Sequence, residues 1–225
     1  MKTRLLYWEN TYLLESSAQI LAIEEESKGR SYLVLDSTIF YPQGGGQPSD
    51  TGEVWLGEQC LKVTFVHIVD GCVRHYIDGP VALSELGQTV RLLVDEKQRM
   101  AHACLHTAGH LLAIAASSAC PEWKPVKGYH FPDGCYVEFE GTLSEEKEVV
   151  IEKLEKSLVC GIARGWPIKA QVISEEGTRT VQIGEHPSVL CGGTHLASCA
   201  ELGGVSIRKI KAKKGRIKVG YDVDF

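Results

Sequence analysis

The hydrophobic positions of the chain change their spacing near residue 94. Before that point, short segments rich in Val, Ile, Leu, Tyr and Thr are separated by Gly, Pro or Asp, a pattern typical of β-strands. The segments expected to be strands are Tyr32–Leu35, Leu61–Val69, Val73–Ile77 and Val90–Val94. We predict that residues 1–94 form a small β-barrel or sandwich.

After that point the pattern becomes helical. Good helix formers fill Asp95–Ser117, and Pro121 follows as a stop signal. A second helix is expected over Glu145–Ala163, where apolar residues recur at helical spacing, with Thr142 or Ser144 as its N-cap. Strand-like segments then return at Ala170–Ile173, Thr180–Ile183 and Ser206–Ile210. The predicted fold class is α+β, with an all-β domain at residues 1–94 and an α+β domain at residues 95–225.

Composition indicates an ordinary globular protein. The 225 residues are 44% hydrophobic and 24% charged, which excludes a disordered chain. The N-terminal residues lack the apolar core of a signal peptide, and the apolar run Leu111–Ala116 is too short to cross a bilayer. We therefore expect a cytoplasmic location without membrane contact. The eight cysteines lack the spacing of a disulfide scaffold and are expected to be reduced.

Positive charge gathers at one end of the chain. The net charge is −5, but residues 208–225 hold seven basic and two acidic side chains, which is +5 there and leaves −10 for the rest. Such a cluster suits a polyphosphate backbone, and it is also compatible with a solvated hairpin that turns at Lys213-Lys214-Gly215. The residues we assign to RNA binding are Arg208, Lys209, Lys211, Lys213, Lys214 and Arg216.

Two pairs of potential metal ligands stand about eighty residues apart. His106 and His110 are four residues apart on the first predicted helix, so both imidazoles face the same side. Cys191 and His195 flank Gly-Gly-Thr, which reads as a tight turn. Two imidazoles, a thiolate and a third imidazole form a ligand set that suits one zinc ion per chain.

The sequence around the candidate ligands disfavours one class of zinc enzyme and leaves two roles for the metal open. His102 lies one turn before His106, but three successive helical turns span about 12 Å, too far for one ion. No glutamate follows His106, so a zincin peptidase, whose general base occupies that position, is disfavoured. Four protein ligands would also suit a closed structural site, whereas catalytic zinc usually keeps one open position.

A glycine-rich stretch in the first region is the other candidate site. Gly44, Gly45 and Gly46 precede Gln47, and three consecutive glycines form either an exposed turn or a backbone that closely approaches a ligand. No Lys-Ser or Lys-Thr follows, so the stretch is not a phosphate loop of the Walker type. We expect no ATP binding.

Taken together, these motifs resemble a known family. The order Gly45-Gly46-Gln47, Asp50, Arg99, His-Thr-Ala-x-His at residues 106–110, Lys127-Gly128, and Cys-Gly-Gly-Thr-His at residues 191–195 is similar to the editing portion of alanyl-tRNA synthetases. It most resembles the stand-alone AlaX editing proteins of medium length, over nearly the whole chain. Editing domains of threonyl-tRNA synthetases usually carry proline where this chain has Thr194.

The resemblance implies a hydrolase without an aminoacylation domain. Its fold would be an N-terminal β-barrel-like domain and a zinc-dependent editing domain with an antiparallel sheet packed by helices. The implied activity is deacylation of tRNA(Ala) mischarged with serine or glycine, which a synthetase pocket for alanine cannot strongly exclude. The implied catalytic residues are Gln47 and Thr107, with Gly44, Gly45 and Gly46 beside the substrate. A zinc-stabilised RNA-binding module without activity, or a threonyl-type editing domain, remains the alternative.

Overall fold

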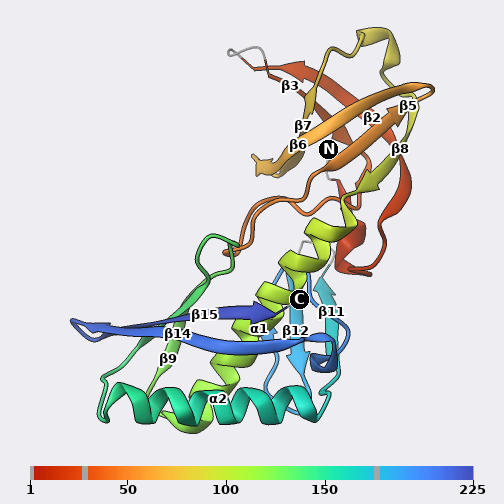
Figure 1. Ribbon diagram of the computed structural model, residues 1–225. Coiled ribbons are helices and arrows are strands. Elements are labelled where there is room, and N and C mark those ends of the chain that lie inside the picture. Colours follow the sequence, from red (N-terminus) through yellow and green to blue (C-terminus); the bar gives the residue numbers. More distant parts are fainter. Residues whose placement is uncertain (1–2, 27–29, 175–177, 225) are drawn as a thin grey trace. The chain divides into compact units, whose positions relative to one another are not determined.

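The computed structural model describes residues 3–26, 30–174 and 178–224 and is mostly β-sheet. Its residues fall into two compact units (Figure 1). The first comprises residues up to Gly44 together with Pro48–Met100, and the second comprises Gly45–Gln47 with the residues from Ala101 onward. The segment Gly45–Gln47, which was expected in the first domain, therefore packs with the second unit. The domain limits at residues 94 and 95 stay a prediction.

The first unit is a closed six-stranded barrel. Its strands follow the order β2 (Glu15–Glu25), β3 (Ser31–Leu35), β7 (Cys72–Asp78), β6 (Gln59–Val69), β5 (Gly52–Leu56) and β8 (Thr89–Val94), all antiparallel to their neighbours. Alternate apolar side chains fill the interior because successive residues of a strand face opposite sides. Short elements complete this unit: β1 (Arg4–Leu5), β4 (Ser37–Thr38), and the 3₁₀ turns η1 (Leu6–Trp8) and η2 (Leu83–Glu85).

The second unit contains two sheets and most of the long helix. The order of the four-stranded sheet is β14 (Gly204–Lys213), β15 (Arg216–Asp224), β10 (Tyr136–Glu140) and β9 (Lys124–Tyr129), all antiparallel. A three-stranded sheet contains β11 (Ile168–Ser174), β12 (Thr178–Ile183) and β13 (Val189–Leu190). A 3₁₀ turn, η3, covers Cys199–Glu201.

Two α-helices occur among the described residues. Helix α1 covers Glu96–Ala119, starting in the first unit and continuing through the second, and α2 covers Lys147–Ala163 beside β14 (Figure 1). Glu155 of α2 accepts a hydrogen bond from the backbone N–H of Ile207 at 2.9 Å, which ties the helix to that strand. Neither helix is long and apolar enough to span a membrane in the part of the chain described.

Most predicted elements are confirmed, with one correction at a helix end. The seven predicted strands and both helices occur near their expected positions. The N-cap of α2 is Glu146, and it makes no side-chain capping bond, so the prediction of Thr142 or Ser144 is wrong. The helix begins later because Glu145 and Glu146 stay in the preceding loop, where Glu145 pairs with Lys153 at 2.6 Å.

A buried histidine lies in the barrel wall. His75 on β7 is fully buried, with Nδ1 at 3.1 Å from the Leu33 carbonyl and Nε2 at 2.7 Å from the Thr38 hydroxyl. Because a carbonyl only accepts, Nδ1 carries the proton of the neutral ring and donates to Leu33. Nε2 therefore accepts from the Thr38 hydroxyl, which itself accepts from the Phe40 N–H at 3.0 Å. Burial lowers the pKa of His75 to about 4 from its ordinary 6.5.

This histidine predicts a loss of stability in weak acid. Below pH 6.5 the unfolded chain binds a proton at His75 that the folded chain does not bind until about pH 4. Unfolding is therefore favoured as the pH falls, by up to about 1.4 kcal/mol per pH unit and about 3 kcal/mol in total over this window. Urea unfolding from pH 7.5 to 4.5 measures it. The variant His75→Gln should lack this part of the slope, and identical slopes would contradict the assignment.

Candidate metal centre

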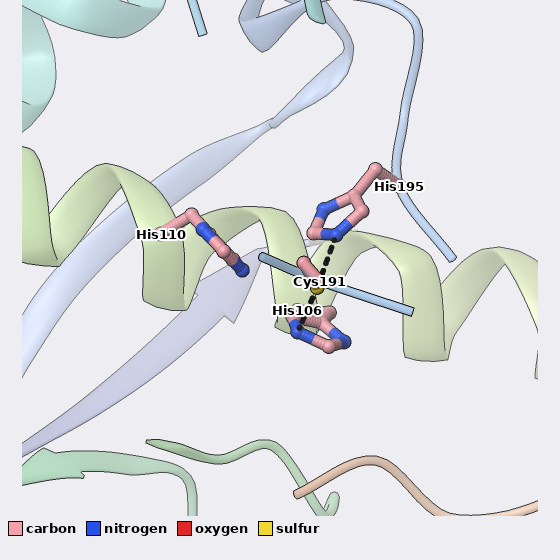
Figure 2. Close-up of side chains that lie close together, drawn as sticks. All are labelled: His106, His110, Cys191 and His195. Carbon is pink, nitrogen blue, oxygen red and sulfur yellow. Dashed lines mark hydrogen bonds between the residues drawn. The ribbon is translucent and has the colours of Figure 1, made fainter. Parts of the chain in front are cut away.

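Four side chains of the second unit converge on one point (Figure 2). His106 and His110 come from successive turns of α1, with ring centroids 5.2 Å apart, and Cys191 and His195 come from the loop after β13. One ligand atom from each residue lies within 4.8 Å of every other. The Cys191 sulfur is 3.4 Å from His106 Nε2 and 3.2 Å from His195 Nε2. The structure thus joins the two ligand pairs that the sequence singled out.

Two of the distances between these atoms lie near those of a tetrahedral zinc site, although the set as a whole extends to 4.8 Å. Zinc bonds of about 2.0–2.1 Å to nitrogen and 2.3 Å to sulfur place neighbouring ligand atoms about 3.3–3.6 Å apart. The two sulfur-to-nitrogen distances lie near this range, and the donors are those that zinc prefers. His102, one turn earlier on α1, is not a member of the cluster.

The cluster also holds its histidines in the form that binds metals. Burial lowers the pKa of His110 to about 4, and it lowers the pKa values of His106 and His195 well below 6.5, helped by neighbouring imidazoles or the Arg179 guanidinium. All three rings are therefore neutral at pH 7, with a lone pair available. Burial raises the pKa of Cys191, and the Gly193 N–H and Arg179 oppose this shift.

Gln47 positions one of the ligands. Its side chain is fully buried, and its Oε1 is 2.7 Å from His106 Nδ1 and accepts from the Thr194 N–H at 3.1 Å. Its Nε2 donates to the Thr194 hydroxyl at 2.9 Å. Because a carbonyl oxygen only accepts, His106 Nδ1 carries the proton and its Nε2 presents the lone pair. The amide thus fixes both a ligand ring and the loop behind it; its direct contact with a substrate stays a prediction.

The glycines before Gln47 have different surroundings. Gly44 belongs to the first unit, where its carbonyl accepts from the Tyr41 hydroxyl at 2.8 Å. Gly46 has φ +78°, and a Cβ there would lie 2.3 Å from the Gly128 carbonyl oxygen. Its own carbonyl accepts from the His130 N–H at 2.7 Å. The close approach that the glycines allow at Gly46 is thus to β9, and a substrate contact by Gly44, Gly45 or Gly46 stays a prediction.

The loop that carries Cys191 is fixed by a residue that sequence reasoning missed. Arg179 on β12 is buried and donates to the carbonyls of Cys191 at 3.0 Å and Gly193 at 2.8 Å. A Cβ on Gly193 would lie 2.1 Å from the His106 ring, so only glycine lets the loop pass so close to the ligand. No sequence motif marks Arg179, because its partners are backbone carbonyls of a distant loop.

Thr107 also lies behind a ligand. Its hydroxyl is fully buried, accepts from the Leu196 N–H at 3.1 Å and is 3.5 Å from His195 Nδ1. These contacts place it against the loop that carries His195. Its assignment as a catalytic residue stays a prediction.

The basic residues form an exposed hairpin. Strands β14 and β15 pair up to Lys213 and Arg216, and Lys214 and Gly215 make a two-residue turn with φ 50° and 73°. A bulge between Ile207 and Lys209 shifts the register, which leaves Arg208 and Lys209 exposed together. The Arg208 guanidinium already has partners within the protein, since it donates to the Tyr221 and Cys135 carbonyls at 2.9 Å and pairs with Asp222.

Aromatic rings adjoin the base of this hairpin. Tyr129 stacks on Phe131 and Tyr136 with centroid distances of 4.5 and 5.2 Å. The Lys218 ammonium lies 3.7 Å from the centroid of the Tyr136 ring, a cation–π contact. Basic side chains together with aromatic rings are features of protein surfaces that bind nucleic acids.

The known proteins similar to this chain are tRNA synthetases and an alanyl-tRNA editing protein. Residues 7–98 match the family model described as class II (A) tRNA synthetases. The alanyl-tRNA editing protein AlaX-M of Pyrococcus horikoshii is 32% identical over 93% of this chain and 91% of its own length. The alanine–tRNA ligases of Caldivirga maquilingensis and Thermofilum pendens are 31% and 32% identical over 96% and 97% of this chain. This chain spans about a quarter of the length of these ligases.

Proposed function

We propose that this chain, which belongs to the family of alanyl-tRNA editing proteins, is a zinc-dependent hydrolase that removes serine or glycine from mischarged tRNA(Ala). The observation that carries the proposal is the convergence of His106, His110, Cys191 and His195 on one point. An aminoacyl-tRNA is an ester, and its hydrolysis needs an activated water and stabilisation of the negative charge that develops on the carbonyl oxygen. A bound Zn²⁺ would supply Lewis-acid chemistry for these tasks.

The residues of the chain have separate roles in this proposal. The three imidazoles and the thiolate would hold the ion, and Gln47 keeps His106 in the tautomer that presents Nε2. Arg179 holds the loop that carries Cys191. Thr107 and Gln47 are the catalytic residues in this proposal, as the family resemblance implies. We expect no ATP in the reaction, because ester hydrolysis does not need it.

A deacylation assay tests the proposal. Purified protein is incubated with Ser-, Gly- and Ala-tRNA(Ala), and loss of each ester is followed. Serine or glycine should be released much faster than alanine, because editing is useful only if the correct product survives. Release of all three at the uncatalysed rate, with tRNA still bound, would instead identify an RNA-binding module. Preference for Ser-tRNA(Thr) would identify a threonyl-type editing protein.

We further propose that the basic hairpin binds tRNA phosphates. Replacing Lys213, Lys214 and Arg216 by alanine should weaken tRNA binding and lower the slope of log affinity against log salt, by about 0.9 for each duplex phosphate that the variant no longer neutralises. Filter binding at several salt concentrations measures both. The matched control removes three exposed lysines elsewhere, Lys147, Lys156 and Lys169. Equal effects of the two triple variants would leave the hairpin without a specific role.

A further inference from the structure

A cavity of about 330 Å³ lies beside the metal centre in the second unit. His110 and His130 form part of its wall, and apolar residues form most of the rest, namely Ala113, Pro125, Val126, Val137, Val189 and Leu190. Three of these side chains, Val126, Val189 and Leu190, are exposed, Leu190 at 74%. A serine or glycine would fill only a small part of this volume. The cavity is therefore large enough for a further, mostly apolar group of the substrate.

His130 is held in one tautomer. Its Nδ1 is 2.6 Å from the Tyr221 hydroxyl, and that hydroxyl donates to the Leu105 carbonyl of α1 at 2.8 Å. Because a phenol has a single proton, Tyr221 accepts from His130, so the proton of the imidazole is on Nδ1. Nε2 therefore presents a lone pair and acts as a hydrogen-bond acceptor.

The ring of His130 is also fixed in place. A Cβ on Gly109 would lie 2.2 Å from its Cε1, and a Cβ on Gly128 would lie 2.3 Å from its Nε2, so both glycines leave space for the ring. The ring stacks on His106 at 4.4 Å between centroids. Only 4% of His130 is exposed, and no hydrogen bond to Nε2 occurs among the described residues. Nε2 is not one of the described buried polar atoms that lack a partner, so it is open to the cavity, and a donor on a ligand can reach it.

The lining of the cavity selects the kind of donor. The reacting end of Ser-tRNA(Ala) offers three: the α-ammonium group, the serine hydroxyl and the ribose hydroxyl next to the ester. Among the described residues, no carboxylate lines the cavity, and Lys127 adds a positive charge. An ammonium group is therefore disfavoured there, whereas a hydroxyl suits the lone pair of Nε2. Of the two hydroxyls, only that of the ribose is common to Ser- and Gly-tRNA(Ala).

We propose that the cavity binds the 3′-terminal nucleoside of the tRNA, and that His130 Nε2 accepts a hydrogen bond from the ribose hydroxyl adjacent to the ester. The apolar wall contacts the base, and the ester then lies toward His110 and the other metal ligands. Tyr221 is a positioning residue, since it acts only through the tautomer of His130. This inference rests on the proposed editing function and names the part of the substrate that the site recognises.

The test compares Ser-tRNA(Ala) ending in adenosine with the same tRNA ending in 2′-deoxyadenosine and esterified at the 3′ oxygen. For the unaltered protein, kcat/KM should fall about 10-fold when the hydroxyl is removed. His130→Asn keeps an N–H toward Tyr221 but lacks the acceptor at the Nε2 position. Its kcat/KM should be about 10-fold lower than that of the unaltered protein on the normal substrate and equal to it on the deoxy substrate. His130→Gln, whose amide oxygen reaches the Nε2 position, should restore sensitivity to the hydroxyl.

Tyr221→Phe provides a second variant if His130→Asn does not fold. Without the Tyr221 hydroxyl, the His130 proton is no longer held on Nδ1. The ratio of kcat/KM between the normal and the deoxy substrate should therefore be smaller in this variant than in the unaltered protein. Metal content and circular dichroism of every variant are measured in parallel. A full 10-fold sensitivity in His130→Asn, or in Tyr221→Phe where His130→Asn is unfolded, would overturn the inference while leaving the editing function intact. Failure of the unaltered protein to hydrolyse the normal substrate would overturn the proposed function itself.

Discussion

Arg99→Met is expected to lower the free energy of unfolding by about 3–5 kcal/mol, since removing one partner of a buried ion pair leaves an uncompensated charge. Arg99 and Asp50 are both fully buried in the first unit, with Nε at 3.0 and 3.1 Å from the two carboxylate oxygens. The guanidinium also donates to the carbonyls of Thr11 at 2.8 Å and Ile39 at 2.5 Å. In the variant, the Asp50 carboxylate and the Thr11 and Ile39 carbonyls lose their hydrogen bonds to the guanidinium. Urea unfolding measures the loss.

The double variant Arg99→Met/Asp50→Leu is the control for this prediction. It removes both charges, so it should be more stable than Arg99→Met alone, although the Tyr41 N–H then loses its bond to Asp50 at 2.6 Å. A loss below about 1 kcal/mol in Arg99→Met would show that the ion pair is not a main support of the first unit.

Gln47→Ala is expected to reduce metal affinity or the deacylation rate about 10- to 100-fold, because hydrogen-bond partners of ligating histidines fix the tautomer and the ring. The substitution removes the acceptor for His106 Nδ1 and for the Thr194 N–H. Single-turnover kinetics and competition with a zinc chelator measure the two quantities. The midpoint of thermal unfolding of the zinc-loaded protein should stay close to that of the unaltered protein.

Gln47→Glu is the matched variant, since it keeps an oxygen at the position that accepts from His106. It should retain most of the metal affinity. Near-normal turnover of Gln47→Ala would contradict the positioning role. Loss of turnover in both variants at normal metal content would favour the direct contact with the substrate that the family resemblance suggests.

The elements that the sequence predicted well are those with an unbroken hydrophobic period. Strand β6 and helix α1 are long, with regular apolar spacing, and both occur near their predicted limits. Strand β2 was missed because it begins Glu-Ser-Ser and ends in two glutamates, so only its middle alternates. Strand β9 was missed because it opens on Lys-Pro, which reads as a loop. Their place in the sheets depends on partners distant in sequence.

The candidate site shows the same division. The four candidate metal ligands could be singled out because spacing on a helix and a glycine turn are local features, and the structure brings them together. Gln47 contacts His106 and Thr194, which are 59 and 147 residues away along the chain, and no local pattern encodes those contacts. Likewise, Asp50 and Arg99 belong to motifs that the sequence displays, but only the fold shows that they pair. The tautomer of His130 depends on Tyr221, 91 residues away.

Zinc dependence is tested most directly by the rate of serine release from Ser-tRNA(Ala) as zinc is returned to protein that has been stripped with a chelator. The stripped protein should release negligible serine, and the rate should rise in proportion to bound zinc and reach a plateau at one zinc per chain. Cys191→Ala, treated identically, should bind zinc weakly and stay slow. Stripped protein that hydrolyses the ester at the full rate would contradict zinc-dependent hydrolysis.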